Sequence, residues 1–227
     1  MRTLTPTEVE VLFENAQENY YYPVVTAVST GLRQAELLGL RWRDIDLDML
    51  SISVSQVLYK RRGICQFKEP KTSHSRRRVA MTPKLALFLR EYKAERERLY
   101  HQIGKHLTLD DLVFIGVEGK PIDPCVLTHV FTRMSRQTNL NGVRFHDLRH
   151  TFASLMLLRG AKPKVISEAL GHSSVAFTMD VYSHIIEGMQ SDAMALLDEV
   201  LPTGKNGVKN RINATLTPTV DIMSRQN

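Results

Sequence analysis

Residues 145–160, FHDLRHTFASLMLLRG, place apolar side chains at helical spacing. Phe145, Leu148, Phe152 and Leu155 recur at intervals of three or four residues, so they line one face of a helix. The stretch ends in a glycine, a residue type that commonly ends helices. Similar spacing recurs on both sides of this stretch, and it predicts a domain that is mainly helical.

Helical patterns cover most of the remaining chain. Thr5, Pro6 and Glu8 predict a helix start, because threonine can cap, proline suits the first turn and Glu8 completes a capping box. This helix is expected over residues 6–16, and further helices are expected over 21–30, 33–40, 83–101, 123–138, 163–171, 174–182 and 187–201. We therefore expect one domain over residues 1–201.

The character of the sequence changes between residues 50 and 81. Ile52 and Val54, with residues 56–58, predict one strand, and residues 64–67 and 78–81 predict two more. A turn is expected at Arg62 and Gly63. The predicted fold class is therefore α+β and mainly α, with a small three-stranded antiparallel sheet.

Positive charge is concentrated in the same region. The chain has 30 Lys and Arg against 24 Asp and Glu, a net charge of +6, and its pI is near 9.4. This balance favours a polyanionic partner such as DNA. The eight basic residues of the sheet region are Lys60, Arg61, Arg62, Lys68, Lys71, Arg76, Arg77 and Arg78, with Glu69 as the one acid. Such a run is either a DNA-binding edge or a solvated face.

Composition speaks against several other classes of protein. No apolar run approaches the ~20 residues that span a membrane, and the first residues carry no apolar signal segment, so a cytoplasmic location is expected. Cys65 and Cys125 are too few for a disulfide framework and do not form a metal-ligand cluster. Asp44 and Asp46 lack a third carboxylate in a metal-binding motif, so loop and cap roles are expected.

Four short motifs, followed by a tyrosine, stand out in this background. They are residues 30–38 with Arg33, the Pro70-Lys71-Thr72 turn, residues 146–153 with His146 and Arg149, residues 170–174 with His172, and finally Tyr182, ten residues after His172. Each has an ordinary structural explanation when it is taken alone. Arg33 and Glu36, for example, form an i,i+3 pair that is worth only ~0.2–0.5 kcal/mol on a helix surface. All of them together, in this order, are not explained by chance.

The ordered set resembles the catalytic domain of tyrosine recombinases, the phage integrase family. The family signature is an Arg after the first helices, a Lys on a sheet turn, a His-x-x-Arg, a His or Trp, and a Tyr nucleophile. The resemblance covers roughly residues 3–200 and implies that Arg33, Lys71, His146, Arg149 and His172 are catalytic, with Tyr182 as the nucleophile. It implies a site-specific recombinase that integrates or excises a mobile element, with four protomers acting on two DNA duplexes. It also implies that the family's N-terminal DNA-clamping domain lies outside this chain.

The residue types suit the chemistry of a DNA phosphodiester. Attack adds negative charge to the nonbridging oxygens, and Arg33 and Arg149 can each donate paired hydrogen bonds to them. His146 shares a helix face with Arg149, and His172 can supply a further donor. Glu36 is expected to position Arg33.

The nucleophile must lose a proton before it attacks. A free phenol has a pKa of ~10, and we expect His146 to accept the proton of Tyr182. By resemblance, Lys71 protonates the departing 5′ oxygen. The 3′-phosphotyrosyl ester keeps the energy of the broken bond, so neither ATP nor a metal cofactor is expected.

Two alternatives remain open at this stage. Type IB topoisomerases resemble these enzymes at the active site and relax DNA by the same chemistry. A DNA-binding remnant without activity is the other. Residues 202–227 are polar, with little helical periodicity, and are expected to form a flexible tail, which by resemblance docks onto a neighbouring protomer.

Overall fold

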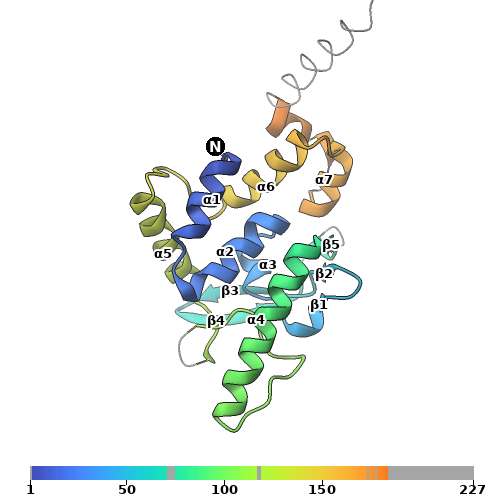
Figure 1. Ribbon diagram of the computed structural model, residues 1–227. Coiled ribbons are helices and arrows are strands. Elements are labelled where there is room, and N and C mark those ends of the chain that lie inside the picture. Colours follow the sequence, from blue (N-terminus) through green and yellow to red (C-terminus); the bar gives the residue numbers. More distant parts are fainter. Residues whose placement is uncertain (1, 71–74, 117–118, 173, 177, 184–227) are drawn as a thin grey trace, which may run out of the picture. The chain divides into compact units, whose positions relative to one another are not determined.

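The computed structural model describes residues 2–70, 75–116, 119–172, 174–176 and 178–183 (Figure 1). These residues belong to one compact unit, Met1–Ile185. The expected domain boundary at residue 201, the helix expected over 187–201, the tail and Lys71 all lie outside the described residues.

Three helices form the N-terminal part. Helix α1 (Pro6–Glu14) starts with the predicted capping box, in which Thr5 and Glu8 each accept a hydrogen bond from the other's backbone N–H. Helix α2 (Glu18–Thr30) begins three residues earlier than expected and ends at a left-handed Gly31. Helix α3 (Gln34–Leu37) is a single turn, shorter than expected. A 3₁₀ turn, Trp42–Asp44, follows it.

The strands form two separate sheets. Strands β1 (Ile45–Asp46), β2 (Ser51–Ser53) and β5 (Arg78–Ala80) make an antiparallel sheet in the order β1-β2-β5. Strands β3 (Val57–Arg61) and β4 (Ile64–Lys68) form a hairpin of their own. The predicted three-stranded antiparallel sheet is confirmed, but its strands differ from those expected.

The hairpin turn has the predicted position. Arg62 and Gly63 both have positive φ, at 50° and 81°. A turn with two such residues matches the twist of the flanking strands, which is why an Xaa-Gly pair joins β3 to β4. The hairpin contacts the rest of the unit through β3, which packs against α3.

Four more helices complete the described part: α4 (Pro83–Gln102), α5 (Pro124–Gln137), α6 (Asp147–Leu158) and α7 (Pro163–Leu170). All four were predicted, and helical backbone returns at residues 175–176 and 178–183. Helix α6 packs against α2 and α7, and α7 also contacts β5 (Figure 1). This packing brings the C-terminal ends of α2 and α7 close to the start of α6.

The core between these elements is apolar. Five fully buried residues of this core are Leu37, Ile52, Leu89, Leu127 and Leu148. The apolar stripe that starts at Phe145 belongs to the same core through Phe145 and Leu148. Within the described segments, every helix falls short of the length or the apolarity that crossing a bilayer requires.

Candidate active site

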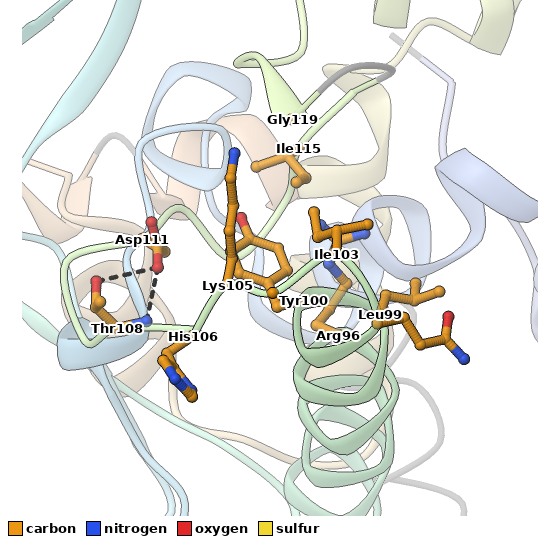
Figure 2. A pocket seen from close by; sticks show the side chains of 12 residues that line it. Arg96, Leu99, Tyr100, Ile103, Lys105, His106, Thr108, Asp111, Ile115 and Gly119 are labelled. Atoms are coloured by element: carbon orange, nitrogen blue, oxygen red, sulfur yellow. Dashed lines mark hydrogen bonds between the residues drawn. The ribbon is translucent and has the colours of Figure 1, made fainter.

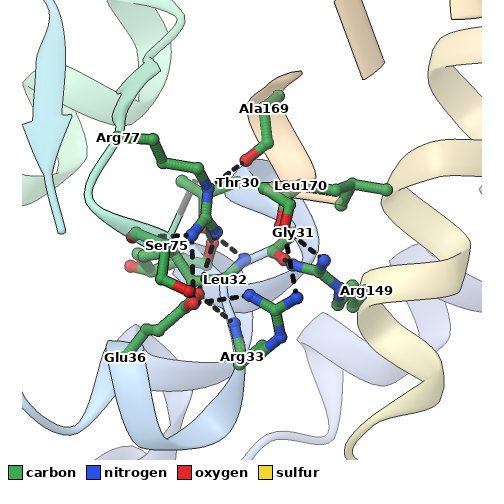
Figure 3. A network of polar contacts seen from close by, with 12 residues as sticks. Thr30, Gly31, Leu32, Arg33, Glu36, Ser75, Arg77, Arg149, Ala169 and Leu170 are labelled. Atoms are coloured by element: carbon green, nitrogen blue, oxygen red, sulfur yellow. Dashed lines mark hydrogen bonds and ion pairs between the residues drawn. The ribbon is translucent and has the colours of Figure 1, made fainter. Parts of the chain in front are cut away.

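The C-terminal end of α7 holds three arginine side chains on three consecutive carbonyl groups (Figure 3). The pairs are Arg77 Nε to Ala169 O at 2.6 Å, Arg149 Nη2 to Leu170 O at 2.5 Å and Arg33 Nη2 to Gly171 O at 3.4 Å. The last carbonyls of a helix have no partner within the helix and carry the negative end of its dipole. The end of α7 is therefore a favourable place for cations, and it gathers them from three distant parts of the sequence.

Arg149 is the most deeply placed of these arginines. Its residue is 4% exposed, and its second guanidinium nitrogen donates to the carbonyl of Gly31 at 2.7 Å. Since Gly31 ends α2, Arg149 joins the ends of two helices. Burial, and then the nearby positive charge of Arg33, lower the pKa of Arg149 to about 9. The group still carries its charge at neutral pH.

Glu36 holds two of the arginines together. Its carboxylate is 2.8 Å from Arg33 Nη1, and it accepts from Arg77 Nη1 and Nη2 at 3.0 and 2.8 Å. Burial alone would raise the pKa of Glu36, but the hydrogen bonds and charges of Arg77 and Arg33 lower it below its ordinary value. The contact with Arg33 is the one that the sequence predicted. Three guanidinium groups against one carboxylate leave this cluster with an excess of positive charge.

The hydroxyl group of Tyr182 lies within hydrogen-bonding distance of a histidine. Tyr182 is fully buried, and its Oη is 2.9 Å from Nδ1 of His150. We expected His146 to accept the phenolic proton, but His150 is the histidine that the structure places at the hydroxyl. His146 instead packs its ring against that of His150, edge to face, with 5.0 Å between the centroids.

Sequence reasoning missed His150, although its spacing contains the signal. His150 follows Arg149 directly and comes four residues after His146, one helical turn further along. The two histidines therefore lie on the same face at the start of α6.

The surroundings of these groups shift their protonation. Burial, and then the charge of His146, lower the pKa of His150 to about 4. Burial and Arg149 likewise lower the pKa of His172 to about 4, and burial is the main cause that lowers the pKa of His146. Burial raises the pKa of Tyr182 to about 12, against the opposing effect of Arg149. At neutral pH the phenol is therefore protonated and the imidazole beside it is neutral.

His172 lies at the end of α7, where Gly171 adopts φ 64° and terminates the helix. Its Nδ1 is 2.9 Å from Oγ1 of Thr178, which belongs to the helical segment that carries Tyr182. Its pKa responds to the charges of both Arg33 and Arg149. Arg33, His146, Arg149, His172 and Tyr182 thus share one region of the structure.

The basic run of the sheet region divides into several environments. Lys60 pairs with Asp123 at the start of α5, Arg76 pairs with Glu69, and Lys68 lies 4.5 Å above the ring of Tyr59. Arg61, Arg62 and Arg78 are exposed. The Arg77 side chain, by contrast, is only 7% exposed and belongs to the Glu36 cluster.

Asp44 and Asp46 have structural partners. Asp44 is bound by Arg41, with Oδ2 3.1 Å from the arginine Nε, and Asp46 accepts backbone hydrogen bonds from Asp48 and Met49. Among the residues that the structure describes, no group of three or more His, Cys, Asp or Glu side chains is placed to hold a metal ion.

Two of the hollows among the described residues differ in their relation to the candidate site. One, of about 410 Å³, is lined by Arg33, Glu36, Tyr59, Lys68 and Pro70, so it opens from the arginine cluster toward the residue that precedes Lys71. The other, of about 870 Å³, lies at the C-terminal end of α4, between Arg96, Tyr100, Lys105 and Asp111 (Figure 2). The described lining of this second hollow contains none of the predicted catalytic residues.

Known proteins resemble the chain in sequence and in structure. The chain is 33% identical over 175 residues to the ICEBs1 integrase of Bacillus subtilis, covering 77% of this chain and 47% of that protein. It is 31% identical to a XerC-like tyrosine recombinase of Caldanaerobacter subterraneus, covering 77% of this chain and 48% of that one. The chain thus spans about half the length of the curated relatives it matches.

Solved structures show the same fold. The Tn1549 transposon integrase, in a complex with transposon right-end DNA, superposes with a TM-score of 0.70 at 24% identity over 86% of this chain and 66% of that one. XerA recombinase gives a TM-score of 0.63 at 22% identity over 96% and 66%. The family model "Phage integrase family" matches residues 2–188. The chain therefore belongs to the phage integrase family, with the fold of a tyrosine recombinase catalytic domain.

Proposed function

We propose that this chain is the catalytic part of a site-specific DNA recombinase that cuts and rejoins strands through Tyr182. The observation that carries the proposal is the contact between the Tyr182 hydroxyl and His150, one residue after the buried Arg149 of a positively charged cluster. A nucleophile, a proton acceptor and fixed cations are the groups that phosphodiester cleavage requires.

The arginines supply the electrostatic part of the reaction. Arg149 is held rigidly by two carbonyls, whereas Arg33 keeps 38% of its side chain exposed at the edge of the cluster. Arg33 is therefore the group that meets the phosphate from solvent, and Arg149 provides the fixed charge behind it. Preorganised donors of this kind each contribute about 10²–10³ in rate.

The covalent step follows from these positions. The oxygen of Tyr182 attacks the phosphorus, a 3′-phosphotyrosyl ester forms, and the 5′ oxygen leaves as a hydroxyl group. We assign the proton for that oxygen to Lys71, as the resemblance to the family implies. Rejoining is the reverse reaction, in which a 5′ hydroxyl attacks the ester, so the cycle consumes neither ATP nor a metal ion.

We further propose that double-stranded DNA lies along the exposed basic residues and that four protomers act together in the cytoplasm. Support for the DNA path comes from the exposed arginines of the sheet region and from relatives solved with DNA, such as the XerH recombinase bound to its difH substrate, whereas the four-protomer assembly rests on the resemblance to the family. Most of these arginines are expected to contact phosphates, which position the protein without reading sequence.

Covalent capture tests the proposal. A pool of duplexes with random sequence, each carrying a 5′-bridging phosphorothiolate, is incubated with the chain, and adducts that resist denaturant are recovered. The wild-type chain should form adducts, because the thiolate leaves without protonation and rejoins poorly. Tyr182→Phe should form none, whereas the control Tyr100→Phe, on α4, should behave as wild type. An adduct with Tyr182→Phe would identify a different nucleophile.

The same capture experiment distinguishes a recombinase from a DNA-binding remnant and from a topoisomerase-like enzyme. Binding without any adduct would point to a DNA-binding remnant. Relaxation of supercoiled plasmid, without strand exchange between two captured duplexes, would point to topoisomerase-like activity.

A further inference from the structure

We propose that His150 is the base that removes the phenolic proton of Tyr182, and that His146 acts on the phosphate. This inference rests on the proposed function, since it assigns a role within the same reaction.

The geometry places only one of the two histidines at the reacting atom. His150 Nδ1 lies 2.9 Å from Tyr182 Oη, within hydrogen-bonding distance, and the two rings are 6.1 Å apart between centroids. His146 occupies the N-cap position of α6, one turn earlier, and is the more exposed of the pair. A group that must meet incoming DNA belongs at the exposed position, and a group that must receive a proton from a buried phenol belongs beside it.

The charge around His150 suits a proton acceptor. To accept from the phenol at Nδ1, the ring must be neutral with its proton on Nε2. The charges that act on it most strongly are those of His146, Asp147, Arg149 and Arg144, from α6 and the residues before it, and His172 at the end of α7 also interacts with it. Burial and the positive neighbours keep the ring neutral, and the fixed negative charge of a bound phosphate would raise its affinity for a proton at the moment of attack.

The step is balanced. The O–H bond of Tyr182 breaks as an N–H bond forms at Nδ1 of His150, and the phenolic oxygen bonds to phosphorus as the 5′ bridging bond breaks. In the reverse reaction the imidazolium returns the proton to the phenolic oxygen. His150 therefore acts as base in cleavage and as acid in rejoining.

A phosphorothiolate duplex recovered by covalent capture isolates this step. Its sulfur leaves without a proton, so the single-turnover rate of adduct formation no longer depends on the leaving-group acid. The rate then reports on activation of the nucleophile and on stabilisation of the phosphate, and its pH dependence separates the two. The variants are His150→Asn, which keeps a hydrogen-bonding group near Nδ1 but cannot titrate, His146→Asn, and the control His129→Asn on the exposed side of α5.

We expect His150→Asn to be slower than wild type by about 10²–10⁴-fold at neutral pH, the usual contribution of a general base. Its rate should then rise about tenfold per pH unit, because hydroxide must remove the proton, whereas the wild-type rate stays flat. His146→Asn should be slower but keep the flat profile. A fourth variant, His150→Gly, leaves space for a free imidazole, so added imidazole should restore its cleavage.

The opposite pattern overturns the inference: a flat profile for His150→Asn together with a rising one for His146→Asn makes His146 the base. Absence of adducts from the wild-type chain would instead refute the proposed function. Nitrogen-15 NMR of the wild-type histidines gives a second test that needs neither DNA nor a variant. Nδ1 of His150 should be unprotonated and hydrogen-bonded, and a proton found on that nitrogen would exclude His150 as the base.

Discussion

Replacing Gly31 with alanine tests how closely the end of α2 fits against α6 and α7. Gly31 has φ 65°, a left-handed conformation that L-residues with a side chain adopt only at a cost. A Cβ at this position would lie 2.5 Å from Cδ1 of Phe152 and 2.8 Å from Cδ2 of Leu170. The same glycine provides the carbonyl that accepts from Arg149.

The expected loss has two parts. The left-handed backbone costs an alanine about 1–2 kcal/mol, and overpacking against the neighbouring side chains costs about 1–3 kcal/mol. Gly31→Ala should therefore lower the free energy of unfolding by about 2–5 kcal/mol, measured by urea denaturation. It should also reduce adduct formation, because Phe152 and Arg149 lie on the same helix and the displaced carbonyl holds the guanidinium.

Gly63→Ala is the matched control. Gly63 has φ 81°, but a Cβ there would meet nothing within 4 Å, so only the backbone cost of about 1–2 kcal/mol applies. The difference between the two variants measures the packing at Gly31. Equal losses of stability would show that the end of α2 accommodates a methyl group and would refute the reasoning.

Two further predictions concern pH and salt. His150 and His172 titrate at about 4 when folded and near 6.5 in the unfolded chain, so the unfolded state binds more protons between these values. The free energy of unfolding should therefore fall as the pH is lowered from about 6.5 to about 4. A double variant with asparagine at both positions should show a shallower fall when unfolding by urea is measured across this pH range. An equal dependence on pH in the variant and the wild type would contradict this prediction. Replacing Arg61 and Arg62 with glutamine should weaken binding to all duplexes alike. It should also reduce the slope of the logarithm of the binding constant against the logarithm of salt concentration by about 0.9 per lost phosphate contact. Arg90→Gln on α4 is the control, and an unchanged slope for the Arg61 and Arg62 variant would make these arginines part of a solvated face.

Local patterns were enough to predict helices α4 to α7. Helices α4 to α7 carry apolar residues at regular spacing between recognisable caps, and their positions were predicted to within a few residues. The sheet was harder. Strand β1 is two residues long, too short for any alternation to show, and its pairing with β2 depends on register between separate segments. The turn at Gly63 was predictable because its signal is local.

The candidate site also contains residues that a local sequence pattern predicts and residues that it does not. Arg33 and Arg149 could be predicted because they belong to short motifs with a fixed order. Arg77 was treated as one more charge in a basic run, since nothing local distinguishes it from Arg76 and Arg78. Its burial depends on Glu36, 41 residues earlier in the chain, and such a contact exists only after folding.

Tyr182 is completely enclosed in the described structure, so the site is in a closed state. A hydroxyl group that solvent cannot reach is equally out of reach of a phosphate in a strand of DNA. On the proposed function, cleavage follows a displacement that uncovers this oxygen and keeps its contact with His150, and DNA binding supplies the free energy for it. A nucleophile that only bound DNA uncovers would confine strand cleavage to duplexes that the protein already holds, with no need for a separate inhibitor.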